Sequence, residues 1–97
     1  MKTILESYKR REYEVELDFY HQFAGYGQYT IFCQVDYLGN SKTFKTHSTN
    51  SMLLDEIQDA KMDGESDHYI KLLYYANFFD NTMKEIVLEW IESVNDN

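Results

Sequence analysis

The sequence contains no proline, a single cysteine and no long apolar run. Without proline-rich or low-complexity tracts, nothing in it indicates a linker, and 97 residues are typical of one domain, residues 1–97. Cys33 has no second cysteine to pair with, which favours a reducing compartment. No apolar stretch approaches the ~20 residues of a membrane-spanning helix, and no secretory signal is visible. We therefore expect a soluble cytoplasmic domain with no membrane contact.

Basic residues are also scarce, with nine Lys and Arg against 17 Asp and Glu and a net charge of −8. Residues 1–54 hold six acids and six bases, so the whole net charge falls in residues 55–97. An acidic surface repels nucleic acid and anionic lipid, and it attracts basic partners. We expect no direct nucleic-acid binding. The one basic cluster, Lys9-Arg10-Arg11, lies in the neutral half, and its role stays open.

Alternation of apolar and polar residues predicts strands in the first half of the chain. In residues 12–20 apolar and acidic side chains alternate strictly, which is typical of a strand with one buried and one solvated face. A glycine-containing connection at residues 23–27 leads to a second strand over 28–37, and a third follows over 42–48. The pattern predicts a three-stranded antiparallel meander over residues 12–48. Residues 1–9 show a short helical spacing of apolar residues instead.

Gly39-Asn40 predicts a type II′ hairpin turn between the second and third strands. In that register Val35 lies opposite Phe44, Cys33 opposite Thr46 and Ile31 opposite Ser48. His47 then points away from Cys33, because neighbouring residues of a strand face opposite sides of the sheet. The register therefore argues against a Cys–His nucleophile.

The second half predicts two or three helices, over about residues 51–61, 67–79 and 82–94. Residues 68–79 are apolar on nearly all sides, so a buried strand is an alternative there. Thr82-x-x-Glu85 predicts a capping box at the start of the last helix. Strands followed by helices predict an α+β fold with the helices on one face of the sheet. The residues expected to meet in its core are Tyr13, Val15, Leu17, Ile31, Cys33, Val35 and Phe44 from the sheet, and Ile57, Leu72, Ile86, Trp90 and Ile91 from the helices.

No spacing of residues predicts catalysis. The acidic stretch over residues 59–70 lacks the ligands of a calcium loop, and a single histidine beside carboxylates does not make a zinc site. We therefore expect no enzyme activity, no metal and no cofactor.

Acidic residues at helical spacing are the main positive feature. Glu85, Glu89, Glu92 and Asp96 fall on one side of the last helix, and Asp55, Asp59 and Asp63 form a similar row near the first. Like charges at this spacing are mildly destabilising, so the rows are either solvated faces that favour solubility or docking surfaces for a basic partner.

Aromatic residues suggest two further contacts. Tyr20, Phe23 and Tyr26 lie at the connection between the first two strands, where they either bind a partner or pack over the end of the sheet. The 68–79 segment, or the free edge of strand 42–48, favours a homodimer as an alternative.

The leading functional hypothesis is a non-catalytic binding protein that engages a basic protein, as an inhibitor, an immunity-type factor or a mimic of nucleic-acid charge. A structural or regulatory homo-oligomer is the alternative, and a small-molecule or enzymatic role ranks third.

Overall fold

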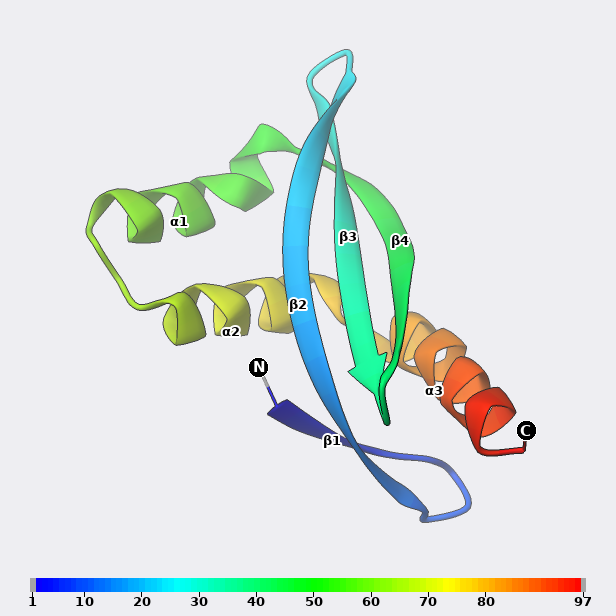
Figure 1. Cartoon of the computed structure of the whole chain (residues 1–97). Coiled ribbons are helices and arrows are strands. Elements are labelled where there is room, and N and C mark those ends of the chain that lie inside the picture. Colours follow the sequence, from blue (N-terminus) through cyan, green and yellow to red (C-terminus); the bar gives the residue numbers. More distant parts are fainter. Residues whose placement is uncertain (1, 97) are drawn as a thin grey trace.

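The computed structural model describes residues 2–96, with side chains described outside residues 46–53. A four-stranded antiparallel sheet in the order β1-β2-β3-β4 precedes three helices, and Figure 1 shows α2 leading behind the strands, with α1 to the left and α3 to the right. This arrangement confirms the predicted α+β class. The elements are β1 (Lys2–Glu6), β2 (Glu12–Gly25), β3 (Gln28–Tyr37), β4 (Asn40–Asn50), α1 (Ser51–Met62), α2 (Asp67–Phe78) and α3 (Asn81–Asn95).

The prediction of three strands was wrong, because β1 adds a fourth in front of them. Leu5 lies opposite Tyr13 in the ladder and is 1% exposed. A helix of so few residues is not stable without extensive docking, whereas a strand of five residues gains its hydrogen bonds from β2. The connection closes through Ser7, whose carbonyl accepts a hydrogen bond from the Arg10 N–H, and Arg10 itself adopts a φ of 63°.

Both long hairpins close with tight two-residue turns. The first turn lies inside the predicted connection over residues 23–27, and the second differs from the predicted one. β2 continues to Gly25, so residues 23–25 belong to the strand and the turn is Tyr26-Gly27. The second turn is Leu38-Gly39 instead of Gly39-Asn40, with φ values of 49° and 81°. Positive φ at both central positions is typical of a type I′ turn, which matches the twist of the flanking strands. A positive φ is unfavourable for leucine, so the backbone at Leu38 is strained, and a sequence pattern does not reveal this.

The changed turn also corrects the register between β3 and β4. Phe44 lies opposite Cys33 instead of Val35, and Val35 lies opposite Lys42. Farther along, a register shift between Thr30 and Phe32 places Ser48 opposite Thr30 instead of Ile31. Phe44 still faces the helices, because Cys33 and Val35 occupy the same side of β3.

The core lies between the sheet and the helices, and every predicted sheet residue is buried in it. Ile57 and Ile91 are also fully buried, and Trp90 packs against the core with its ring edge-on to Phe44. Leu72 and Ile86 were predicted wrongly, since they are 41% and 45% exposed.

Their exposure follows from how each helix is turned toward the sheet. The ambiguous 68–79 segment is helical as α2, and its buried side carries Tyr74 and Phe78. The buried side of α3 carries Met83, Val87, Leu88 and Ile91. Asp80 caps α3 in place of the predicted Thr82, since its carboxylate accepts a 2.9 Å hydrogen bond from the Met83 N–H.

Candidate binding surfaces

The predicted acidic row on α3 lies on the side of the helix that faces solvent. We call Glu85, Glu89, Glu92 and Asp96 the α3 ridge. Glu85, Glu89 and Asp96 are exposed, and Glu92 is half-buried. None of the four forms an ion pair with another residue in the part of the chain that the structure describes. The ridge therefore presents negative charge that the described fold does not neutralise by direct contact.

A groove runs between the ridge and the turn that joins β1 to β2. Its walls are Ser7, Tyr8, Leu88 and three ridge carboxylates, and it encloses about 310 Å³. The Tyr8 ring is 89% exposed, whereas Leu88 is only 8% exposed and forms an apolar floor. Long basic side chains bury their methylene stems against apolar surface and keep the charge near acids. The groove has the chemistry to hold a lysine or arginine side chain.

The basic cluster of the neutral half lies beside the other end of the ridge. Lys9 and Arg11 line a hollow of about 170 Å³ together with Glu92 and Asp96. The charges are close enough to attract each other through solvent without forming an ion pair. These two bases therefore oppose the negative charge of the ridge at its Glu92 and Asp96 end, and Lys84 lies beside Glu85 at the other end, where both line a further hollow.

The predicted row on α1 forms a separate surface. Asp55 and Asp59 are exposed on α1, and Asp63 follows the end of the helix. Asp59 and Asp63 line a hollow between α1 and the start of α2. Figure 1 shows α1 toward the end of the sheet that carries the β2–β3 turn, and α3 toward the end with β1. The two rows do not form one continuous acidic surface.

The three aromatic residues predicted as a contact patch are not brought together. Tyr20 stacks on Phe32 on the face of the sheet away from the helices, at a centroid distance of 4.9 Å. Phe23 points to the other face, where its ring packs edge-on against Tyr29. Tyr26 lies in the turn and is fully exposed. The strand alternation that the register imposes therefore divides them.

The open face of the sheet, opposite the helices, carries an acidic surface that sequence reasoning missed. Alternation and register place all six acids of residues 1–54 on it. They are Glu6, Glu12, Glu14, Glu16, Asp18 and Asp36. Counting charge by halves of the chain concealed this surface, because three of the six bases that cancel the acids in the sum, Lys9, Arg10 and Arg11, lie at the β1–β2 turn. The alternation over residues 12–20 was the signal that could have revealed it.

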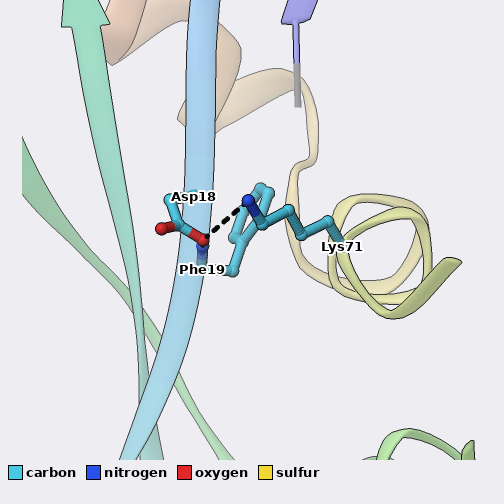
Figure 2. Close-up of polar contacts among 3 residues, drawn as sticks. All are labelled: Asp18, Phe19 and Lys71. Carbon is cyan, nitrogen blue, oxygen red and sulfur yellow. Dashed lines mark hydrogen bonds and ion pairs between the residues drawn. The ribbon is translucent and has the colours of Figure 1, made fainter. Parts of the chain in front are cut away.

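One carboxylate of the open face is tied to the helical layer. Figure 2 shows Lys71 reaching from α2 to Asp18, with 3.6 Å between Nζ and Oδ1. The same carboxylate accepts a 3.0 Å hydrogen bond from the Phe19 N–H. Both side chains remain partly exposed, so the pair contributes little to stability. The ion pair does mean that the charge of Asp18 already has a partner within the fold.

The titratable groups under the helices are arranged for packing. Burial raises the pKa of the Cys33 thiol to about 12, and the charge of Asp18 adds to the rise. His21 Nδ1 lies 2.7 Å from the Tyr74 hydroxyl. Burial lowers the pKa of His21, with a further contribution from Lys61, and burial raises the pKa of Tyr74. Cys33 therefore stays a neutral thiol, and His21 stays a neutral imidazole at neutral pH.

The chain has two further histidines, His47 and His68. His68 is exposed, and the side chain of His47 lies outside the described set. No group of three His, Cys, Asp or Glu side chains converges on a point that could hold a metal ion, as far as the described part of the chain extends. None of the helices, over the residues described, combines the length and apolar character needed to cross a membrane.

Comparison of the chain with protein-family models, with curated proteins and with solved structures finds no match. The class that the structure defines is an α+β domain with helices on one face of an antiparallel sheet and acidic side chains on three surfaces. Its function has to be inferred from those surfaces.

Proposed function

We propose that this protein is a non-catalytic binding protein that engages a basic protein partner through the α3 ridge. The observation that carries the proposal is the alignment of four carboxylates on the solvent side of α3 without ion pairs to other described residues. Charge arranged in this way attracts a cationic surface over several ångströms and raises the rate of association. Inhibition, immunity or mimicry of nucleic-acid charge are three uses of such contact.

The groove beside the ridge supports a specific mode of contact. A basic side chain of the partner would lie along Leu88 and Tyr8, with its charge among the carboxylates of Glu85 and Glu89. Aromatic rings and carboxylates together stabilise a guanidinium better than either does alone. Asp96 would contribute less, because Lys9 and Arg11 lie close to that end of the ridge.

A charge-reversal pair tests the proposal. Affinity capture from the native cell would first supply the partner, and its binding would then be measured with Glu85→Lys/Glu89→Lys and with the matched pair Glu56→Lys/Glu65→Lys. All four positions are exposed, and both variants change the net charge equally. The ridge pair should lose binding while the matched pair keeps most of it. Equal weakening by both pairs, or none by either, would contradict the proposal.

A homodimer remains a second candidate because α2 keeps an apolar stripe on its outer side. Tyr69 and Leu72 are 43% and 41% exposed, and Ala76, about one turn beyond Leu72, is exposed on the same side of the helix. β4, the strand predicted to offer a free edge, does lie at the edge of the sheet. Light scattering of the wild type and of Leu72→Glu would decide. A mass that stays monomeric at all concentrations rejects the dimer.

A further inference from the structure

The open face of the sheet has more carboxylates than its cations can neutralise. Six acids lie on it, whereas Lys2 and Lys45 are the two bases that the register places there among the described residues. The register places these side chains on the face opposite to the buried Leu5, Val15 and Leu17, and Glu6 also lines a hollow with Lys84 and Glu85 of α3. The Asp18 carboxylate is occupied by Lys71, and Asp36 accepts a hydrogen bond from the Ser41 hydroxyl. Glu6, Glu12 and Glu14 form no such contact with described residues.

The register sets like charges directly opposite each other. Glu6 faces Glu12 across the β1–β2 ladder. Glu16 faces Asp36 across the β2–β3 ladder, and Lys2 faces the same Glu16 from β1. Such pairs lie close enough to repel and destabilise a sheet. Solubility alone would be served as well by acids and bases in alternation. A cation placed over the strands would relieve the repulsion, so the fold itself favours a positively charged occupant.

An aromatic pair adjoins the carboxylates on the same face. The rings of Tyr20 and Phe32 lie nearly parallel, with an interplanar angle of 14°, and Tyr20 is 40% exposed. Along β2, Tyr20 follows Asp18 in the series of residues that point outward. A planar guanidinium stacks on an aromatic ring and also binds carboxylates through paired hydrogen bonds, which an ammonium does less well. The combination therefore selects arginine over lysine.

We propose that the open face is a second docking surface, and that its occupant is an extended, arginine-bearing segment of a protein partner. The outward carboxylates of β2 repeat every ~6.8 Å, which is also the repeat of alternate side chains in an extended chain. Arginines at alternate positions would meet Glu12 and Glu14 and reach Tyr20. Phosphates of a nucleic acid or of lipid would be repelled. The inference takes the basic class of partner from the proposed function and adds a surface and a residue type.

The test uses a short peptide of alternating arginine and serine, and the same peptide with lysine in place of arginine. Binding to the full chain would be followed by amide chemical shifts. The account expects shifts along residues 12–20 of β2 and along β3, and weaker binding of the lysine peptide. Shifts confined to α3, or spread equally over every acidic surface, would overturn it.

Matched variants separate this inference from the proposed function. Glu12→Lys/Glu14→Lys should weaken binding of the arginine peptide about tenfold or more, while Glu56→Lys/Glu65→Lys should change it little. Folding should survive, because a lysine at position 12 faces Glu6 and removes a repulsion. Tyr20→Leu should reduce the preference for arginine over lysine.

The same variants decide between the two surfaces. If only Glu85→Lys/Glu89→Lys weakens binding of the peptide, the open face is rejected as its binding surface and the α3 ridge is supported. If only the β2 pair does, the open face stands and the ridge is rejected for this ligand.

Discussion

The α3 ridge and the open face of the sheet carry the same chemical groups on two different kinds of scaffold. On α3 the carboxylates share a side because they step by about one helical turn, so each residue is placed by its own helix. On the sheet they share a side only because separate strands pair in a particular register. The comparison shows that an acidic surface built by one element can be predicted from local sequence, whereas one built by several strands requires their pairing.

The two surfaces also differ in how the fold opposes their charge. Lys9 and Arg11 lie near the Asp96 end of the α3 ridge, and Lys71 contacts Asp18 at the edge of the open face. Neither contact involves Glu85 and Glu89 on the ridge or Glu12 and Glu14 on the open face, and these four residues form no ion pair with described residues. Substitutions at these four residues therefore test the two surfaces separately.

The largest effect on stability is expected from truncating a side chain that packs between α3 and the sheet. Ile91→Ala should lower the free energy of unfolding by about 2–5 kcal/mol, because this fully buried side chain fixes α3 against the sheet. Urea denaturation would measure it, with Ile86→Ala as the matched control. The control should cost much less, since Ile86 is 45% exposed. Equal losses would contradict the assignment of the buried side of α3.

A smaller loss of stability is expected on acidification. Burial lowers the pKa of His21 in the fold below its ordinary value of 6.5, so the unfolded chain takes up a proton first. The stabilising contribution of neutral His21 is complete above pH 6.5 and is lost as the pH falls through the lowered value. The free energy of unfolding of the wild type should therefore fall over this pH range. That of His21→Gln should lack this part of the pH dependence, and denaturation curves at several pH values would measure both. An unchanged pH dependence in the variant would exclude His21 as the cause.

Relief of repulsion between carboxylates on the open face should increase the stability of the fold. Glu12→Lys should raise the free energy of unfolding by about 0.2–1 kcal/mol, because it replaces a like-charged pair with Glu6 by an opposite pair. Glu14→Lys is the matched control, since Glu14 lies opposite Ile4 and gains no partner of opposite charge. A gain of equal size in both variants would point to net charge instead of the pairing.

The smallest effect is expected from the corresponding change on the ridge. Glu89→Lys removes repulsion from Glu85 and Glu92 along α3 and should stabilise the helix by roughly 0.2–0.5 kcal/mol. Glu89→Gln should give an intermediate value, and thermal unfolding monitored by circular dichroism would measure both. A loss of stability in either variant would show that the fold uses the Glu89 charge.

Sequence patterns predicted what depends on local periodicity. The buried residues of β2 and β3, the helices and the α3 ridge all follow from spacing within one element. β1 was missed because five residues carry too little pattern to distinguish a strand from a helical turn. The Leu38-Gly39 turn was missed because it requires a positive φ at a leucine, which only the pairing of β3 with β4 imposes.

The positions of the candidate binding surfaces were predictable in part for the same reason. The α3 ridge was placed correctly on one side of its helix, but the groove beside it depends on the β1–β2 turn and could not be foreseen without β1. Tyr20 and Phe23 were grouped because they are near in sequence, although strand alternation sends them to opposite faces. The open face stayed hidden because its acids come from three strands and half of the bases that balance them in the sequence lie at a turn.

The central claim is that carboxylates of the α3 ridge bind a cationic partner directly. The measurement that tests it most directly is the affinity of the captured partner for the wild type and for Glu85→Lys/Glu89→Lys across a range of salt concentrations. The account predicts weaker binding by the variant at low salt and a shallower dependence on salt, because fewer charge contacts remain to be screened. Equal affinity and an equal dependence on salt would contradict it.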